Sequence, residues 1–432
     1  MNFAMNNFLK NLMDEYDIDL NHSGVNGERV AARLAKLSLI GVTEDGGITR
    51  IGYSKEEEEA KELVIGWMKE AGLSVSRDGA GNVFGRLEGQ KISPAVMSGS
   101  HLDSVPNGGN FDGPLGVLAA LEVVEAWKLA GYTPPIPYEV VIFTDEEGSR
   151  FKTGLTGSRS FMGKITEEEL DYIRDGNGQT FDEVIEAYGS DRKSYLDADY
   201  QSGNLKMFVE VHIEQGTVLE KHNEPTGIVK GIAGPAGLEV SFKGKAGHAG
   251  NTPMENRKDP VIAAGMFVQE IESLPRQVSQ TAVATVGKMD VLPNGINVIA
   301  QEVNLIVDIR DINEETRDKL IKLIYQKAEA IAEKRGIEVT WDINSKIKPM
   351  PISPALQEKL ATVMNKLEIA PVYIPSGAAH DSMIMGQEIP TAMIFTRSKD
   401  GISHNPDEWS SLNDCVKTIH VLKEFVESVM EE

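Results

Sequence analysis

In the first half of the chain, short apolar runs alternate with segments that carry apolar residues at helical spacing. Three apolar runs, at 95–97, 138–143 and 207–213, have the composition of buried strands. Segment 54–71 has the pattern of an amphipathic helix that stops before a glycine, and segment 113–131 is apolar enough for a buried helix. This order of strand, helix and strand predicts an α/β layer architecture, with polar side chains gathered at the carboxyl ends of the strands.

The pattern changes beyond about residue 231, where strand-like segments combine with predicted helices at 259–274 and 314–335. This combination indicates a second, α+β domain. After residue 351 the pattern of the first part returns and ends in a helix at 412–430. We therefore predict a two-domain α/β protein in which an α/β/α domain is interrupted by an inserted α+β domain. The predicted segments are 1–227, 228–346 and 347–432.

Length and composition agree with this organisation and exclude several kinds of partner. A chain of 432 residues exceeds the usual size of one core, and 41% hydrophobic with 25% charged residues is typical of a globular protein. The formal net charge of -23 would repel a phosphate backbone, so we expect no nucleic-acid partner. We find no segment long and apolar enough to span a membrane. The single cysteine, Cys415, allows no intrachain disulfide, which predicts a cytoplasmic protein.

A histidine and two carboxylates follow the first predicted strand. His101 and Asp103 are two positions apart, so both side chains can project from the same side of an extended segment. Asp112 lies in the sequence GGNFDG, whose glycines allow a tight turn that would bring its carboxylate back toward His101. Nitrogen and oxygen ligands of this kind suit zinc, manganese or cobalt, so these residues are candidates for a metal site.

Further candidates follow the other two strands and a loop near the C-terminus. Asp145, Glu146 and Glu147 form a run of carboxylates that would repel one another without a cation. On an extended segment Glu146 and Glu147 point in opposite directions, so one can bind metal while the other takes a proton from water. His212 lies at the third strand end and His404 in the loop. A lone histidine at a strand end more often has a structural role. The joint occurrence of these histidines and carboxylates nevertheless favours a metal site.

Seven motifs occur in an order that resembles one family of metalloenzymes. They are GSHLDSVPNGGNFDGPLGV, FTDEEGSRF, VEVHIEQG, GHAGNTPMENRKDP, NGINVI, PSGAAHDS and DGISHNPDEW. They span nearly the whole chain and resemble the amidase, hydantoinase and carbamoylase branch of the M20 metallopeptidase superfamily. Within that branch, the motifs are most similar to those of N-carbamoyl-L-amino-acid hydrolases, followed by allantoate amidohydrolases and β-ureidopropionases.

The resemblance implies a centre with two divalent metal ions, with zinc, manganese and cobalt as candidates. Asp112 would bridge the two ions, and the remaining ligands would be His101, His212, Glu147 and His404. Glu146 would be the general base of the reaction. Asp103 would orient the His101 ring, a role that metal-binding imidazoles usually require.

The residues that would recognise the substrate lie mostly in the inserted domain, which the resemblance identifies as a lid. His248 would stabilise an oxyanion, and its alternative is a turn histidine with local hydrogen bonds. Arg310 would bind a substrate carboxylate, and its alternative is an ion pair with Asp308 or Asp311. The other implied substrate contacts are Gln215, Asn297 and His380.

The function that we predict is hydrolysis of N-carbamoyl-L-amino acids, small substrates with a carboxylate, to the amino acid, carbon dioxide and ammonia. An allantoate amidohydrolase is the first alternative, because the local motifs do not separate the two activities. A peptidase or aminoacylase is less favoured, because His212 stands where related peptidases generally present a carboxylate. A metal-dependent binding protein would have no need of Glu146. The resemblance also implies a homodimer formed through the inserted domain.

Overall fold

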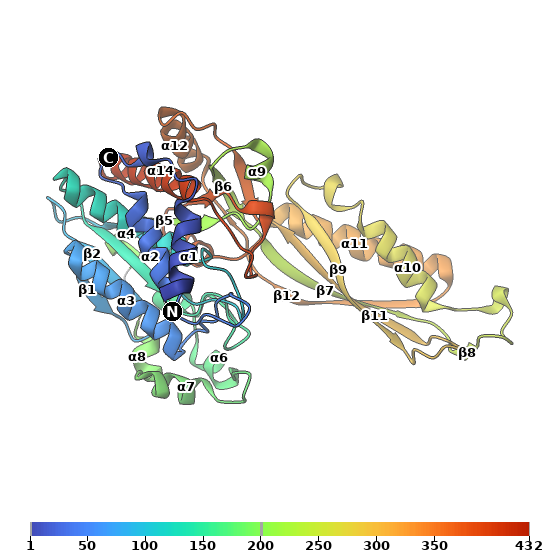
Figure 1. The fold of residues 1–432 in the computed structure, drawn as a ribbon. Helices are drawn as coiled ribbons and strands as arrows, with labels where there is room; N and C mark the ends of the chain where they lie inside the picture. Colours follow the sequence, from blue (N-terminus) through green and yellow to red (C-terminus); the bar gives the residue numbers. More distant parts are fainter. Residues whose placement is uncertain (1, 199–201, 432) are drawn as a thin grey trace. The chain divides into compact units, whose positions relative to one another are not determined.

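The computed structural model describes residues 2–198 and 202–431, which divide into two compact units (Figure 1). The first unit comprises Met1–Val229, Ile352–Ile374 and His380–Glu432. The second comprises Lys230–Pro351 with Pro375–Ala379. The chain thus leaves the first unit after residue 229 and returns after residue 351, where the sequence predicted boundaries at 227 and 346.

The first unit contains most of a nine-stranded sheet, whose order is β1-β2-β4-β3-β5-β15-β6-β13, with β14 paired to β6; the residues of β13 belong to the second unit. The strands of this sheet are β1 (Ser74–Arg77), β2 (Val83–Leu87), β3 (Ala95–His101), β4 (Tyr138–Phe143), β5 (Leu205–Ile213), β6 (Thr226–Ile232), β13 (Met350–Pro351), β14 (Tyr373–Ser376) and β15 (Thr391–Thr396). The central strands β4, β3, β5 and β15 are parallel, and antiparallel pairs flank them. The carboxyl ends of the parallel strands therefore lie at one edge of the sheet, where α/β proteins usually place their sites.

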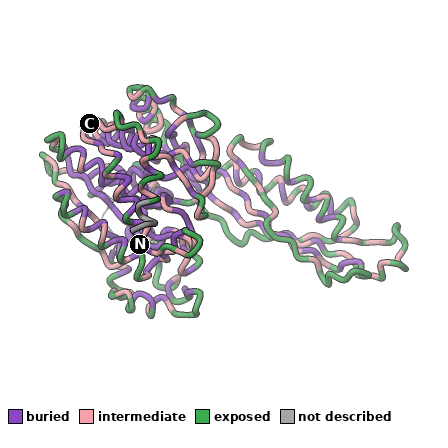
Figure 2. Tube along the Cα trace, in the orientation of Figure 1, coloured by how far each residue is buried: buried purple, intermediate pink, exposed green. Residues whose placement is uncertain are grey.

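Helices cover both faces of this sheet because its central strands are apolar on both sides. Val96 and Val140 belong to one buried cluster, whereas Met97 and Val141 belong to another. The first cluster includes side chains of α2 (Gly27–Leu37), α3 (Lys55–Ala71), α4 (Pro114–Ala130), α12 (Pro354–Lys366) and α14 (Leu412–Met430), and the second includes α5 (Thr156–Phe161) and α13 (Asp381–Met385). Figure 2 shows the buried residues, in purple, along these strands. The predicted α/β/α architecture is confirmed.

The helix ends follow capping signals in the sequence. The helix predicted at 54–71 is α3, which begins after the capping hydroxyl of Ser54 and ends at Gly72 with φ 96°. The remaining helices of the first unit are α1 (Asn2–Met13), α6 (Glu167–Tyr172), α7 (Phe181–Tyr188), α8 (Arg192–Leu196) and α9 (Val218–His222). Among the residues that the structure describes, no helix has both the length and the apolarity to cross a membrane.

The second unit is an antiparallel sheet with two helices. The sheet order is β12-β7-β11-β9, and its strands are β7 (Gly234–Lys243), β9 (Val283–Leu292), β11 (Glu302–Asp311) and β12 (Glu338–Lys346). Alternate residues of β7, including Val240 and Phe242, share an apolar cluster with Phe267 of α10 (Pro260–Ile271) and Leu320 of α11 (Glu314–Arg335). The two helices lie side by side (Figure 1). A separate two-stranded ribbon pairs β8 (Gly247–His248) with β10 (Val298–Ile299).

Candidate metal centre

The candidate ligands of the first unit gather at the carboxyl ends of the parallel strands. His101 is the last residue of β3, and His212 lies one residue before the end of β5. Glu146 and Glu147 follow β4, and Asp112 lies in the loop between β3 and α4. Because β3 pairs in parallel with both β4 and β5, these side chains reach the same edge of the sheet.

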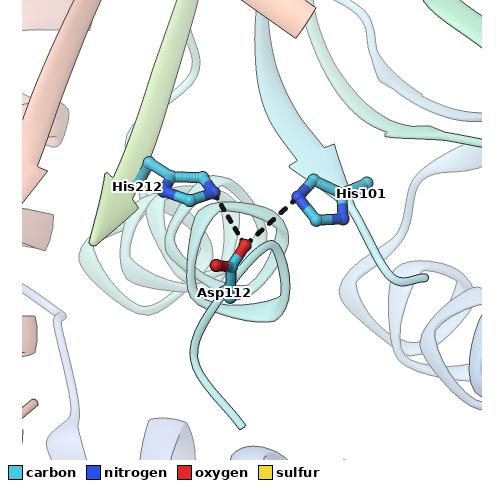
Figure 3. Close-up of side chains that lie close together, drawn as sticks. All are labelled: His101, Asp112 and His212. Atoms are coloured by element: carbon cyan, nitrogen blue, oxygen red, sulfur yellow. Dashed lines mark ion pairs between the residues drawn. The ribbon is translucent and has the colours of Figure 1, made fainter. Parts of the chain in front are cut away.

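The first group of candidate ligands is His101, Asp112 and His212 (Figure 3). Asp112 Oδ1 lies 3.1 Å from His212 Nε2 and 3.6 Å from His101 Nε2. Backbone carbonyls orient both rings, because His101 Nδ1 lies 3.1 Å from the Asp103 oxygen and His212 Nδ1 lies 3.0 Å from the Ile213 oxygen. A hydrogen on each Nδ1 leaves the Nε2 lone pairs directed toward Asp112, as metal binding requires.

The second group uses the other carboxylate oxygen of Asp112. His404 Nε2 lies 3.4 Å from Asp112 Oδ2 and 3.4 Å from Glu147 Oε2. The His404 side chain is 49% exposed, whereas those of Asp112 and Glu147 are 6% and 7% exposed. Asp112 therefore joins two sets of three ligand atoms, and the atoms of each set lie within 4.8 Å of one another.

These side chains fit a divalent cation by their chemistry, and two of them carry a buried atom without a hydrogen-bond partner among the described residues. His101 Nε2 and Glu147 Oε1 are buried, and neither has a hydrogen-bond partner among the described residues. A buried polar atom in this state is unfavourable unless a ligand satisfies it. Imidazole nitrogens and carboxylate oxygens are ligands that zinc, manganese and cobalt accept. The two groups are therefore suited to divalent metal ions.

The charges of the cluster perturb one another strongly. Burial raises the pKa of Glu146 well above its usual value, and burial together with Asp112 raises the pKa of Glu147 to about 7. The hydrogen bond to Asp112 raises the pKa of His404 to about 9. Although burial opposes ionisation, His212 holds the pKa of Asp112 well below its usual range. Glu146 and Glu147 thus attract protons in this cluster, and a bound cation would compete with those protons.

The segment that carries Glu146 and Glu147 is not extended, contrary to the prediction. Asp145 adopts φ 53°, and its Oδ2 accepts a hydrogen bond of 3.0 Å from the Thr156 hydroxyl. A left-handed residue reverses the backbone where strand alternation would otherwise continue. The separate directions of the two glutamates therefore come from a turn, which apolar periodicity did not reveal.

Asp103 holds this turn as well as lying beside His101. Its two carboxylate oxygens accept the backbone N–H groups of Glu146 and Glu147, both at 3.1 Å. The carboxylate lies 3.5 Å from His101 Nδ1, farther than the backbone oxygen of the same residue. Asp103 is thus placed to fix the predicted base, in addition to its predicted role in orienting His101.

Of two glycines near Asp112, one acts as predicted and the other is needed for a different reason. Gly113 adopts φ 80°, and a Cβ atom there would lie 2.5 Å from the His101 ring. A Cβ atom at Gly109 would instead lie 2.0 Å from the Glu408 carboxylate. Gly113 therefore supplies the conformational freedom, whereas Gly109 makes room for a side chain that approaches from the C-terminal part of the chain.

Gln215 and His380, both predicted to contact the substrate, lie beside the candidate ligands of the first unit. Gln215 Nε2 donates to Asp112 Oδ2 at 2.8 Å, so this amide contacts a candidate ligand directly. The His380 ring centroid lies 4.4 Å from that of His212. Burial lowers the pKa of His380 well below its usual value, with His212 adding to the effect, so the ring is neutral. Contact of Gln215 and His380 with substrate remains a prediction.

His248 and Asn297 belong to the second unit, where His248 is in β8 and Asn297 directly precedes β10. The backbone N–H of Ala249 donates to the Asn297 oxygen at 3.0 Å. His248 is exposed, and its Nδ1 accepts the N–H groups of Gly250 at 3.0 Å and Asn251 at 3.2 Å. These are the local hydrogen bonds expected if His248 is a turn histidine, the predicted alternative to a role in oxyanion stabilisation. They also place the ring proton on Nε2, which is then free to act as a donor.

Arg310, on β11, is engaged within the second unit. Its Nε and Nη2 donate to the two carboxylate oxygens of Asp308 at 2.9 and 2.8 Å, and its Nη1 donates to the Gly377 oxygen at 2.7 Å. The ion pair with Asp308, one of the predicted alternatives, is therefore present. Asp311 instead accepts hydroxyl groups, including that of Thr281 at 2.5 Å.

The structure also reveals polar residues at the centre that sequence reasoning missed. Glu210 is fully buried in β5, where it accepts the Ser100 hydroxyl at 2.8 Å and the Ser382 N–H at 2.9 Å. In the sequence, Glu210 was visible only as an acidic residue within the apolar run 207–213. Ser403 and Glu408, which contact the Asp112 loop, were visible only as members of the motif DGISHNPDEW.

Comparison with known proteins covers nearly the whole chain. Residues 97–428 match Peptidase family M20/M25/M40, a range that contains both ligand groups. The chain is 43% identical to an N-carbamoyl-L-amino acid amidohydrolase of Geobacillus stearothermophilus, across 92% of this chain and 97% of the relative. It is 32% identical to an allantoate amidohydrolase of Escherichia coli (strain K12), across 91% and 96% of the two chains. The crystal structure of an amidase of the hydantoinase/carbamoylase family from Burkholderia multivorans superposes with a TM-score of 0.87 and 33% identity, covering 95% of this chain and 99% of that one.

Proposed function

Since the chain belongs to peptidase family M20/M25/M40, whose amidohydrolase members it resembles along its length, we propose that it hydrolyses N-carbamoyl-L-amino acids with two divalent metal ions. That it is a hydrolase of C–N bonds follows from its relatives. The observation that carries the finer proposal is the sharing of Asp112 by two sets of ligand atoms, with Glu146 beside them. The higher identity to the carbamoyl-amino-acid relative than to the allantoate relative supports the choice of substrate.

Each ligand group would hold one ion. His101, Asp112 and His212 would bind the first, and Asp112, Glu147 and His404 would bind the second. When bound, divalent ions of this kind polarise a carbonyl group and lower the pKa of water. The protein's own residues then have to supply proton transfer, orientation and charge stabilisation.

Glu146 is the proposed general base. Its Oε2 lies 3.8 Å from His101 Nε2, and burial raises the pKa of its carboxyl group, which makes it a stronger proton acceptor. Glu146 takes a proton from the attacking water, whose oxygen forms a bond to the carbamoyl carbon. As the bond between the carbamoyl carbon and the amino-acid nitrogen breaks, Glu146 returns that proton to this nitrogen. The amino acid leaves, and the remaining carbamic acid decomposes to carbon dioxide and ammonia. Asp103 keeps the base in place through the backbone N–H groups of the turn.

The second unit carries residues that would contact the rest of the substrate. The Nε2–H of His248 is a suitable donor for the oxyanion of the tetrahedral intermediate. Asn297 directly precedes β10, the strand paired with β8. Arg310 would bind the substrate carboxylate. The substrate carboxylate would then accept the hydrogen bonds that Arg310 now donates to Asp308. Gln215 and His380 would contact the substrate from the first unit.

A substrate panel tests this proposal. Ammonia and free amino acid would be measured after adding N-carbamoyl-L-amino acids, N-carbamoyl-β-alanine, allantoate or a dipeptide to the protein reconstituted with zinc, manganese or cobalt. We expect turnover of the N-carbamoyl-L-amino acids. Preference for allantoate would keep the mechanism and replace the substrate, and cleavage of the dipeptide alone would overturn the proposed substrate class.

The proposed assembly is a homodimer formed through the second unit. Its helix α10 exposes Val261, Ile262 and Val268 at 39%, 48% and 36%, although these side chains are apolar. Apolar residues grouped on an exposed helix face favour burial against another surface. Light scattering should give twice the mass of one chain, and a monomer would contradict this part of the proposal.

A further inference from the structure

Glu408 is a buried carboxylate to which the proposed chemistry gives no task. It is 2% exposed and lies in the loop that follows His404. Its Oε1 accepts the backbone N–H groups of Phe111 at 2.8 Å and of Asp112 at 3.1 Å. Its Oε2 accepts the Ser403 hydroxyl at 3.0 Å. One side chain therefore connects the loop that carries Asp112 with the loop that carries His404.

Ser403 stands between two carboxylates but has only one proton to donate. Its Oγ lies 2.8 Å from Asp112 Oδ2 and 3.0 Å from Glu408 Oε2, and it accepts a hydrogen bond of 3.1 Å from Gln215 Nε2. The hydroxyl can donate to only one of these carboxylates at a time. Glu408 thus offers an acceptor that lets the Ser403 proton leave Asp112, which removes one of the hydrogen bonds that compete with a cation for Asp112 Oδ2.

The backbone around both contacts is packed independently of Glu408. The rings of Phe111 and Trp409, which adjoin Asp112 and Glu408 in sequence, have centroids 5.6 Å apart, and Phe8 of α1 lies 6.1 and 5.8 Å from them. This aromatic contact keeps the two loops together when the polar bonds are changed. Loss of the Glu408 carboxylate should therefore shift the Asp112 side chain without unfolding the loops.

We propose that Glu408 is a positioning residue that sets the affinity of the second ligand group for its divalent cation without binding the cation itself. The inference rests on the proposed function, because it takes Asp112, Glu147 and His404 as ligands of one ion. Charge-assisted bonds to two successive N–H groups fix the direction of the Asp112 backbone. Partners of this kind commonly change metal affinity by about 10- to 100-fold.

The test is a Co²⁺ titration of the metal-free protein, followed by visible absorption and by elemental analysis after dialysis. In Glu408→Gln the new amide would donate to Ser403 and turn its proton toward Asp112. We expect this variant to bind its first ion as the unchanged protein does and its second at about 10- to 100-fold higher free Co²⁺. The kcat should recover when Co²⁺ is raised, with KM unchanged, which a general loss of structure would not produce.

Two further variants complete the experiment. Asp407→Asn is the matched control, because it removes the same charge from the exposed neighbouring position, and it should bind both ions normally. Glu408→Asp keeps the charge but shortens the side chain, so that its carboxylate can no longer bond to both loops; it should weaken the second ion alone, so it serves if Glu408→Gln fails to fold. Binding of the second ion at unchanged Co²⁺ in a folded Glu408 variant would overturn the inference. Failure of the unchanged protein to bind a second ion would instead overturn the proposed function.

Discussion

The two ligand groups share Asp112 but differ in what holds their histidines. His101 and His212 project from parallel strands, their side chains are 1% and 2% exposed, and backbone carbonyls orient their rings. His404 projects from a loop, adopts φ 55° and is 49% exposed. One half of the centre is therefore built by the sheet, whereas the other depends on contacts between loops, among which those of Glu408 are the most extensive.

This difference leads us to expect unequal metal affinity. Ligands on rigid, buried elements lose little conformational freedom when an ion binds, whereas a loop histidine has to be ordered. The group on the strands should therefore bind its ion more tightly than the group that includes His404.

The largest effect is expected from Glu146→Gln, which leaves both groups intact and removes only the base. Because the amide cannot accept the proton of the attacking water, kcat should fall by about 10²- to 10⁴-fold. Elemental analysis should find the same metal content as in the unchanged protein. Loss of metal together with activity would show that Glu146 is a ligand, and retained activity would show that another residue is the base.

A smaller and unequal effect is expected when each half loses its own histidine. His212→Ala leaves buried ligand atoms without their partner, and it should remove the tightly bound ion. In His404→Ala water can replace the exposed ring, so the first ion should stay bound while the second is lost. Isothermal titration with Zn²⁺ would measure both affinities. Equal losses in the two variants would break the distinction between strand and loop ligands.

The smallest effect concerns His420, a buried histidine outside the metal centre. His420 Nε2 lies 2.9 Å from the Leu20 carbonyl oxygen, and burial lowers the pKa of His420 from 6.5 to about 4, opposite to the rise at His404. The unfolded chain binds this proton at higher pH than the folded chain. Neutral His420 therefore makes its full contribution to the free energy of unfolding above about pH 6.5. This contribution is lost as the pH falls through about 4, by up to roughly 3 kcal/mol.

Urea unfolding at about pH 7.5 and about pH 4 would measure this contribution. The unchanged protein should lose more stability between the two values than His420→Gln, which cannot titrate at this position. Equal losses would show that His420 is protonated as readily in the folded chain as in the unfolded chain.

The regular elements could be predicted from the sequence because their signals are local. Apolar spacing and caps placed α3, α11 and α14 at the observed residues, and the apolar run 138–143 is β4. The helix predicted at 259–274 is the shorter α10, since Pro275 begins a 3-10 turn just beyond it.

The details of the centre were less accessible because they depend on long-range contacts. Glu408 bonds to the N–H of Phe111, which is 297 positions away, and no local pattern announces such a bond. The left-handed Asp145 is held by Thr156, so an extended segment was predicted where a turn lies. The roles assigned to the individual ligands came from the resemblance, and they remain predictions until metal is located.

The most direct test of the account is an X-ray diffraction experiment on crystals soaked in Zn²⁺, with anomalous data collected on both sides of the zinc absorption edge. The account predicts two peaks in each chain, one between His101, Asp112 and His212 and the other between Asp112, Glu147 and His404. The peak beside His404 should be the first to weaken when the Zn²⁺ concentration is lowered. A single peak, or peaks away from Asp112, would contradict the proposed two-metal centre.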